Sequence, residues 1–380
     1  MKSFKDALEE KIVLSLKNNY AINNFDEFRF GNYADSVTNN KANAPAVFSV
    51  KHLKNIVKKL IGYNPGKKGY LENANGMLNG HSKGFENIWA HLNATDKELL
   101  LAIIAYRVMG YKKVKLPRNN PEYWNAIKTA KALADRSDTY DPHFMHFLLE
   151  KFDLNPIGFD VKFFFSEIGV AIDFILEQYA YKVNGTTIVS VESGATVLDI
   201  GGCWGDTALY FAYKAGKLGK VYSFEFIPDN IKLFKINTAL NPALLPQIEL
   251  VSHPVFNKSG EEIYFKDNGP GSKVAFEPFE GQTGTTTTVS IDDLVREKGI
   301  DKVDFIKMDI EGAEPMALQG AIETIKKFRP QLAIAIYHSI DDFVNIPNWI
   351  LGLGLDYEIF LGHYTIHAEE TICFAKPKSK

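Results

Sequence analysis

The stretch from Val197 to Thr207 constrains the fold of this chain more than any other. It reads Val-Leu-Asp-Ile-Gly-Gly-Cys-Trp-Gly-Asp-Thr, an apolar strand followed by a glycine turn and the start of a helix. Glu225 follows the next predicted strand, Val221–Phe224. A nucleoside ligand needs these features together, because glycines let the backbone approach it closely and a carboxylate accepts hydrogen bonds from a ribose diol.

The glycine spacing argues against a dinucleotide cofactor. The dinucleotide fingerprint needs glycine at the first, third and sixth places of the turn. Counting from Gly201, the third and sixth places are Cys203 and Asp206, and the chain contains no Gly-Lys-Ser/Thr phosphate loop. The turn instead reads Asp-x-Gly-x-x-x-Gly from Asp199 to Gly205, which is typical of methyltransferases that use S-adenosylmethionine (SAM). SAM has no pyrophosphate, but its ammonium group needs a carboxylate.

Strands and helices alternate from about residue 180 onward. Strands are predicted at 197–200, 221–224, 248–251, 305–308, 332–336, 357–361 and 371–375, with helices at 207–215, 228–237, 291–298, 315–328 and 343–353 between them. This alternation predicts an α/β fold with a doubly wound, mostly parallel seven-stranded sheet. Ligands bind such sheets at the carboxyl ends of the strands. The polar residues predicted at those ends are Asp199, Glu225, Ser252, Asp309 and His338.

The first 175 residues are predicted to be mainly helical. Apolar residues recur at helical spacing over 7–16, 50–61, 96–109, 121–134 and 143–152. We therefore divide the chain into a mainly helical N-terminal accessory or acceptor region, residues 1–175, and a methyltransferase domain, residues 176–380. No motif in the first region identifies an acceptor, so its roles as a lid, an acceptor platform or an oligomer interface stay open.

Composition limits the cellular compartments and the binding partners that can be expected for this protein. The formal net charge of −3 over 380 residues shows no basic excess, so no nucleic-acid partner is expected. Two cysteines argue against a disulfide scaffold and fit a reducing compartment. No run approaches the roughly 18 apolar residues of a membrane span, and the first residues lack the apolar segment of a secretory signal. These features predict a cytoplasmic protein without a membrane span.

Further motifs follow the glycine turn in the order found in FkbM-type methyltransferases. They are Phe224–Asn230, Val289–Leu294 and Val303–Glu314, and the Lys-x-Asp-x-Glu-Gly-x-Glu run within the last is the most specific. The chain resembles this family over about residues 176–380, with looser similarity around 99–116. The resemblance implies a class I methyltransferase fold, SAM as the cofactor, and O-methylation of a sugar, glycan or natural-product hydroxyl.

The chain departs from the family pattern at two places. Glu225-Phe226 stands where many members have Glu-Pro, and Tyr337-His338 ends the fifth strand where Glu-x-His is often found. The second departure bears on the catalytic assignment, because it changes the side chains at the carboxyl end of that strand.

The residues expected to bind SAM lie in the glycine turn and after the second and third strands. They are Asp199, Gly201, Gly202, Cys203, Gly205, Asp206, Thr207, Glu225, Phe226, Ser252 and His253. Glu225 is expected to accept the ribose hydroxyls, and Phe226 to contact the adenine side. Ser252 and His253 are expected at the adenine edge.

Methyl transfer to a hydroxyl requires a base or a metal ion, because the hydroxyl has a high pKa. The catalytic candidates are Asp309, Glu311 and His338, with His338 preferred as proton acceptor because an imidazole titrates near neutral pH. Glu311 has an alternative role at the start of the following helix. His363 and His367 could join Asp309 and His338 in a divalent metal site, although their spacing matches no fixed metal signature.

Two other functions stay open at this stage. One is a SAM-binding subunit without catalysis, which is disfavoured because a degenerate site would be expected to lose part of the set Asp199, Gly201, Gly205 and Glu225. The other is a methyltransferase that acts on a nitrogen acceptor. No motif of the sequence identifies the acceptor, which is a small molecule or a glycan. No motif identifies the oligomeric state either.

Overall fold

The computed structural model describes residues 2–34, 65–144 and 148–378. The chain forms two compact units, Met1–Pro121 with Thr365–Glu370, and Glu122–Tyr364 with Thr371–Lys380. We call them the helical unit and the sheet unit. The division between residues 175 and 176 that the sequence predicts differs from this one and stays a prediction. The predicted helix over 50–61 lies outside the described residues.

The helical unit is built around the helix α7. Its elements are α1 (Phe4–Ser15), η1 (Ile22–Asn24), α2 (Glu27–Phe30), α5 (Pro65–Leu78), α6 (Ser82–His91) and α7 (Ala94–Met109). Both α1 and α5 pack against α7, whose residues Leu100, Ile103 and Ile104 are fully buried. The predicted helices over 7–16 and 96–109 are confirmed.

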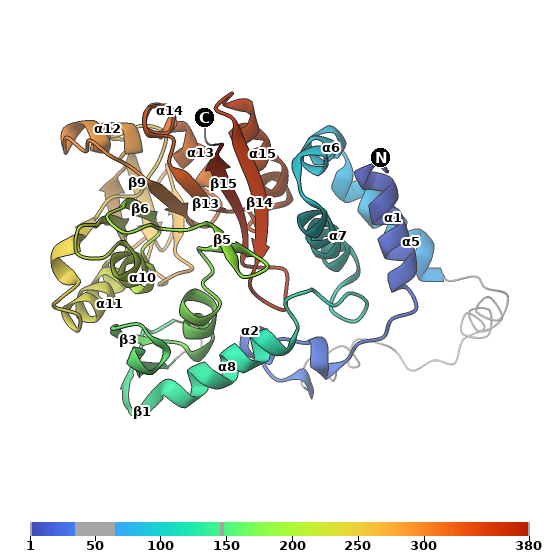
Figure 1. Cartoon of the computed structure of the whole chain (residues 1–380), viewed down its shortest axis with the longest axis horizontal. Coiled ribbons are helices and arrows are strands. Elements are labelled where there is room, and N and C mark those ends of the chain that lie inside the picture. The colour runs from blue at the N-terminus through green and yellow to red at the C-terminus, as the bar shows by residue number, and fades with distance from the viewer. Residues whose placement is uncertain (1, 35–64, 145–147, 379–380) are drawn as a thin grey trace. The chain divides into compact units, whose positions relative to one another are not determined.

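A seven-stranded sheet forms the core of the sheet unit, in the order β14-β15-β13-β12-β6-β7-β8. The strands are β6 (Thr196–Ile200), β7 (Lys220–Phe224), β8 (Ile248–Val251), β12 (Phe305–Met308), β13 (Gln331–Ala335), β14 (Tyr357–His363) and β15 (Thr371–Pro377). Only β15 runs antiparallel to its two neighbours, β13 and β14, beside which it lies in Figure 1. The seven predicted strands and the doubly wound class I Rossmann-like fold are therefore confirmed.

The strand order places a ligand-binding edge in this sheet. From β6 the chain moves outward through β7 to β8, and then returns to the other side of β6 for β12 and β13. The switch point lies between β6 and β12, where the loops after the two strands diverge and leave room for a ligand at the carboxyl ends. Both neighbours of β6 run parallel to it, so these carboxyl ends lie at one edge.

Helices connect the strands of this sheet. They are α10 (Asp206–Ala215), α11 (Pro228–Ala239), η4 (Leu245–Gln247), α12 (Ile291–Glu297), α13 (Glu314–Gln319), α14 (Ile322–Phe328) and α15 (Ile340–Gly352). The single helix predicted over 315–328 is wrong, because α13 and α14 are separate helices. Gly320 lies at the break, where a Cβ atom would stand 2.3 Å from the carbonyl oxygen of Phe256. This close approach of backbone to backbone ends α13.

Residues 122–189 add helices and short strands to the sheet unit. They form α8 (Pro121–Leu133), β1 (Ala134–Tyr140), β2 (Leu149–Asp153), η2 (Asn155–Ile157), β3 (Lys162–Phe165), α9 (Glu167–Gly169), the π-helix η3 (Val170–Ile175), β4 (Tyr181–Val183) and β5 (Thr186–Val189). The helix predicted over 143–152 is wrong, because β2 pairs with β1 on one side and β3 on the other. Asn237 of α11 bonds both the N–H and the carbonyl oxygen of Phe164, which ties β3 to α11.

A small antiparallel sheet, in the order β10-β9-β11, stands between β8 and α12 in the sequence. Its strands are β9 (Glu262–Lys266), β10 (Lys273–Ala275) and β11 (Gly284–Thr287). Three successive threonines, 285–287, lie in β11. None of the helices in residues 2–34, 65–144 and 148–378 has the length and apolar character to span a bilayer.

Candidate cofactor and catalytic site

The glycine turn after β6 is shaped by the neighbouring strand. Gly201 has a φ of +90°, and a Cβ atom on it would stand 2.0 Å from the backbone carbonyl oxygen of Asp309. Gly205 has a φ of +86°, a conformation that costs other residues free energy. The sequence assigned these glycines to clearance for a ligand. At Gly201 the structure gives a different reason, which is contact with the backbone that follows β12.

Asp199 lies wholly inside the protein. Its carboxylate accepts hydrogen bonds from the hydroxyls of Thr207 at 3.0 Å and Ser223 at 2.7 Å. The ammonium group of Lys307 lies 3.3 Å from it. Ser223 and Lys307 are the residues opposite Asp199 on β7 and β12. Asp199 and Thr207, both expected to bind SAM, therefore hold the strands and the turn in place.

Lys307 is a site residue that sequence reasoning missed. Its ammonium group donates to the carbonyl oxygen of Gly201 at 2.5 Å, and its side chain is 2% exposed. Burial by itself lowers the pKa of Lys307, but the charges of Asp199, Asp309 and Asp206 outweigh burial and raise it. The signal was a lysine inside an otherwise apolar strand, where a charge requires a partner.

Glu225 stands at the carboxyl end of β7 with both carboxylate oxygens hydrogen-bonded to the protein. Its Oε1 accepts the N–H groups of Phe226 at 2.7 Å and Ile227 at 2.8 Å, at the start of α11. Its Oε2 accepts the amide of Asn230 at 3.1 Å. Burial raises the pKa of Glu225 to about 7, although these hydrogen bonds oppose the shift. A second donor to Oε2 would stabilise the ionised form.

Trp204, within the glycine turn, belongs to the core. Its side chain is 6% exposed, and its indole N–H donates to Asn230 at 3.1 Å. Because Asn230 in turn donates to Glu225, the tryptophan fixes the direction of that donor. Hydrogen bonds through Asn230 thus link Trp204 of the glycine turn to Glu225 after β7.

The remaining cofactor candidates lie around the same strand ends. Burial raises the pKa of Asp206 to about 6, against the opposing charge of Lys307. Burial also raises the pKa of Cys203, which keeps it a thiol. Phe226 is half-buried with its ring against Phe265. Two more candidates, Gly202 and the exposed Ser252, lie within the turn and after β8, and the exposed His253 bonds the carbonyl oxygen of Thr287 at 2.9 Å.

Asp309, at the end of β12, is held by two tyrosine hydroxyls. Tyr337 donates to its Oδ1 at 3.1 Å and Tyr179 to its Oδ2 at 3.3 Å. Its side chain is 16% exposed. Burial raises the pKa of Asp309, more than the charges of Lys307 and His338 lower it. Tyr179 could not be found by motif, since it lies 130 residues away in the sequence.

His338 lies among three carboxylates. Its Nε2 is 3.5 Å from Asp309 and 3.7 Å from Glu311, and its Nδ1 is 3.3 Å from Glu314. Burial by itself lowers the pKa of His338, but these acidic neighbours raise it to about 9. Most of the imidazole then carries its proton at neutral pH. This argues against the preferred role of His338 as proton acceptor, which needs the neutral ring.

Glu311 and Glu314 differ in exposure and therefore in role. The side chain of Glu311 is 63% exposed, on a backbone with a φ of +57°. Glu314 is fully buried, and its Oε1 accepts the N–H of Ile310 at 2.7 Å. Glu314 thus fixes the loop between β12 and α13 and turns toward His338.

The strand, glycine turn and helix that carry this site lie within a segment that matches a known protein family. The model of the methyltransferase FkbM domain matches residues 194–359. Residues 194–359 form an FkbM methyltransferase domain. This match confirms the family resemblance that the sequence motifs indicate, and the catalytic candidates Asp309, Glu311 and His338 all lie within the domain.

Many solved structures are similar to the chain. An FkbM methyltransferase from Methylobacillus flagellatus KT is 20% identical with a TM-score of 0.48, and the match covers 80% of this chain and 61% of that one. Fibrillarin from Aeropyrum pernix, crystallised with natively bound SAM, is 12% identical with a TM-score of 0.34, over 60% of this chain and 89% of that one. A search of the curated proteins found no match. The assignment of the FkbM domain rests on residues 194–359.

His363 and His367 lie outside the FkbM match, and they belong to different compact units. His363 of the sheet unit is 3% exposed, with its Nδ1 2.9 Å from the hydroxyl of Thr371. His367 of the helical unit has its Nε2 3.5 Å from Asp26. In the described part of the chain, the group of potential metal ligands that lie close together is instead Asp309, Glu314 and His338.

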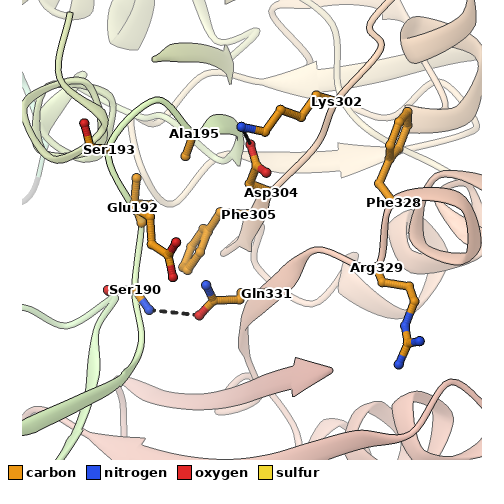
Figure 2. Close-up of a pocket in the computed structure, with 11 residues that line it drawn as sticks. Ser190, Glu192, Ser193, Ala195, Lys302, Asp304, Phe305, Phe328, Arg329 and Gln331 are labelled. Carbon is orange, nitrogen blue, oxygen red and sulfur yellow. Dashed lines mark hydrogen bonds and ion pairs between the residues drawn. The ribbon is translucent and has the colours of Figure 1, made fainter. Parts of the chain in front are cut away.

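A cavity of about 240 Å³ opens at the opposite end of the FkbM domain's sheet. Figure 2 shows its lining, which comes from the amino ends of β6, β12 and β13 and the segment after β5. Two pairs of its polar groups bind each other: Lys302 pairs with Asp304 at 3.1 Å, and the N–H of Ser190 donates to Gln331 at 3.1 Å. Ligands of such sheets bind at the carboxyl ends, so this cavity is separate from the cofactor site.

Proposed function

We propose that the chain is a SAM-dependent methyltransferase that transfers the methyl group to a hydroxyl of a sugar, a glycan or a natural product. The observation that carries this proposal is the meeting of two kinds of side chain at one sheet edge. Glu225 ends β7, and the cluster of Asp309 and His338 ends β12 and β13. A nucleoside-binding acid and a proton-handling cluster at the same strand ends suit transfer between a bound nucleoside and an acceptor.

Glu225 fits the ribose of SAM. Its Oε2 has one donor from the protein, Asn230, and burial raises the pKa of Glu225, so the ionised carboxylate would be stabilised by further donors. The two ribose hydroxyls would supply them. Asp199 does not fit a direct contact, because Thr207, Ser223 and Lys307 already surround its carboxylate. We therefore give Asp199 a positioning role beneath the glycine turn.

The chemical step needs alignment and removal of one proton. SAM supplies an activated methyl group, and the acceptor oxygen must approach it in line, which is a matter of positioning. As the oxygen–carbon bond forms, the carbon–sulfur bond breaks and the hydroxyl releases its proton. Asp309 is partly exposed at this edge, and Tyr179 and Tyr337 fix its orientation. We assign the release of the proton to the cluster of Asp309 and His338.

Residues 1–175 are proposed to select the acceptor. The residues assigned to SAM begin at Asp199, and the earlier part of the chain is absent from the FkbM match at 194–359. The residues of the matched domain do not explain how the acceptor is chosen. Changes in this region should therefore alter the acceptor and leave SAM affinity unchanged.

Replacing Glu225 by alanine tests the cofactor. SAM affinity is expected to fall at least about 100-fold, because two hydrogen bonds to a buried charge are lost. Calorimetric titration of SAM, with NAD as a comparison ligand, measures the effect. Glu323→Ala is the matched control, since that glutamate is 76% exposed on α14. A folded Glu225→Ala protein with unchanged SAM affinity, or a wild type that prefers NAD, would contradict the assignment.

SAM affinity is also expected to depend on pH through Glu225. Its pKa of about 7 without ligand lies above the ordinary 4.5, so its contribution to folding is present below pH 4.5 and is lost as the pH rises through 7. SAM binding has the opposite preference, because the ribose hydroxyls donate to the ionised carboxylate. From pH 7.5 to 5.5 the dissociation constant should rise by roughly tenfold or more. Glu225→Gln should remove this dependence, and a flat wild-type profile would contradict the role.

A further inference from the structure

Three side chains from separate elements meet at the carboxyl edge of the sheet. Asp309 follows β12, Glu314 begins α13, and His338 follows β13. One potential ligand atom from each lies within 4.8 Å of the other two. His338 approaches Asp309 through Nε2, at 3.5 Å, and Glu314 through Nδ1, at 3.3 Å, and a cation would take only one of these two nitrogens.

Three polar atoms of this cluster are buried without hydrogen-bond partners, on His338 and Glu314. The side chain of His338 is 10% exposed, and neither of its ring nitrogens has a partner with hydrogen-bond geometry. Glu314 is fully buried, and its Oε2 also lacks a partner. A buried polar atom left without a partner costs free energy, so such atoms usually mark a ligand or a functional site.

The charges of the cluster are unbalanced. The carboxylates of Asp309, Glu311 and Glu314 all lie within 3.7 Å of the imidazole of His338. Lys307 is already bound to Asp199 and Gly201. One imidazolium can offset only one of the three negative charges. A divalent cation would offset two and would give one ring nitrogen of His338 and the carboxylate oxygens a partner.

We propose that Asp309, Glu314 and His338 bind one divalent cation. Two carboxylates and one imidazole suit Mn²⁺ or a similar first-row ion, since carboxylates favour hard ions and imidazole favours the later ones. Neighbouring ligands of an ion with bonds of about 2.1 Å stand about 3.0 Å apart, so ligand atoms that lie within 4.8 Å of one another would have to close in by up to about 1.8 Å. The role of the ion rests on the proposed function: it would bind the acceptor oxygen and lower the pKa of its hydroxyl.

Titration of the full-length protein with Mn²⁺, without SAM or acceptor, tests the site. The electron paramagnetic resonance signal of free Mn²⁺ is expected to fall by one equivalent in the wild type. Glu314→Gln should weaken binding at least tenfold, because it removes a charged ligand while its oxygen can still accept the N–H of Ile310. Glu323→Gln, an exposed change on α14, should leave binding unchanged. Asp309→Asn is the second test variant if Glu314→Gln fails to fold.

The site is overturned if the wild type binds no Mn²⁺, or if it binds no more tightly than folded Glu314→Gln and Asp309→Asn proteins. SAM binding, measured on the same samples, separates this failure from that of the proposed function. Mn²⁺ binding without SAM binding would uphold the cation site and reject the methyltransferase. SAM binding without Mn²⁺ binding would reject the cation site and leave the methyltransferase standing.

Discussion

Gly201→Ala is expected to cost at least about 3 kcal/mol in the free energy of unfolding, which is enough to deplete the folded protein. The added Cβ atom would stand 2.0 Å from the carbonyl oxygen of Asp309, and real Cβ atoms do not come that close. That oxygen belongs to backbone between β12 and α13, so it cannot move aside as a side chain would. Chemical denaturation, together with the yield of soluble protein, measures the effect.

Gly299→Ala is the matched control for this substitution. Gly299 also has a positive φ, +63°, but nothing stands within 4 Å of the position that its Cβ atom would take. Its variant should therefore show only the cost of the left-handed conformation, about 1 kcal/mol. If Gly201→Ala costs no more than Gly299→Ala, the contact with Asp309 does not explain why glycine stands in the turn.

His338→Ala and Asp309→Asn are expected to lower turnover by about 10²–10⁴-fold while SAM affinity stays within a few-fold of wild type. Groups that assist removal of the acceptor proton contribute a factor of this size, and His338 is expected to do so by pairing with Asp309 and not as the base itself. Both side chains lie at the ends of β12 and β13, whereas the ribose contact comes from Glu225 after β7. Transfer of labelled methyl groups from SAM to fractionated glycans and metabolites measures turnover, and calorimetry measures SAM affinity.

Glu311→Gln is the comparison variant for the chemical step. Its carboxylate is 63% exposed and 3.7 Å from His338, so it should matter less than Asp309. Normal turnover of folded His338→Ala and Asp309→Asn proteins would leave positioning alone to explain catalysis. A loss of SAM affinity equal to the loss of turnover would place these residues in the cofactor site instead.

The sheet could be predicted because its signal is local. Each buried parallel strand is a short apolar run with a polar residue after it. In the helices between the strands, apolar residues instead recur at helical spacing. The two wrong helix predictions, over 143–152 and 315–328, depended on distant neighbours. Leu149–Asp153 becomes a strand because β1 and β3 pair with it, and Gly320 breaks a helix because Phe256 lies against it.

By itself the sequence determined the strand ends and the chemistry expected there. Asp199, Glu225, Asp309 and His338 follow or end apolar runs, and the carboxyl ends of parallel strands converge. Only the tertiary structure decided what each of them does. Asp199 is enclosed because Ser223 and Lys307 are its partners on the adjacent strands, and the pairing of strands is not written in any one of them.

The pKa of His338 likewise depends on the tertiary structure and not on the residue type alone. A histidine in isolation titrates near neutral pH and suggests a base. In the fold, Asp309, Glu311 and Glu314 surround its ring and raise its pKa to about 9. Burial and the distances to neighbouring charges set a pKa, and both exist only once the loop after β12 lies beside the end of β13.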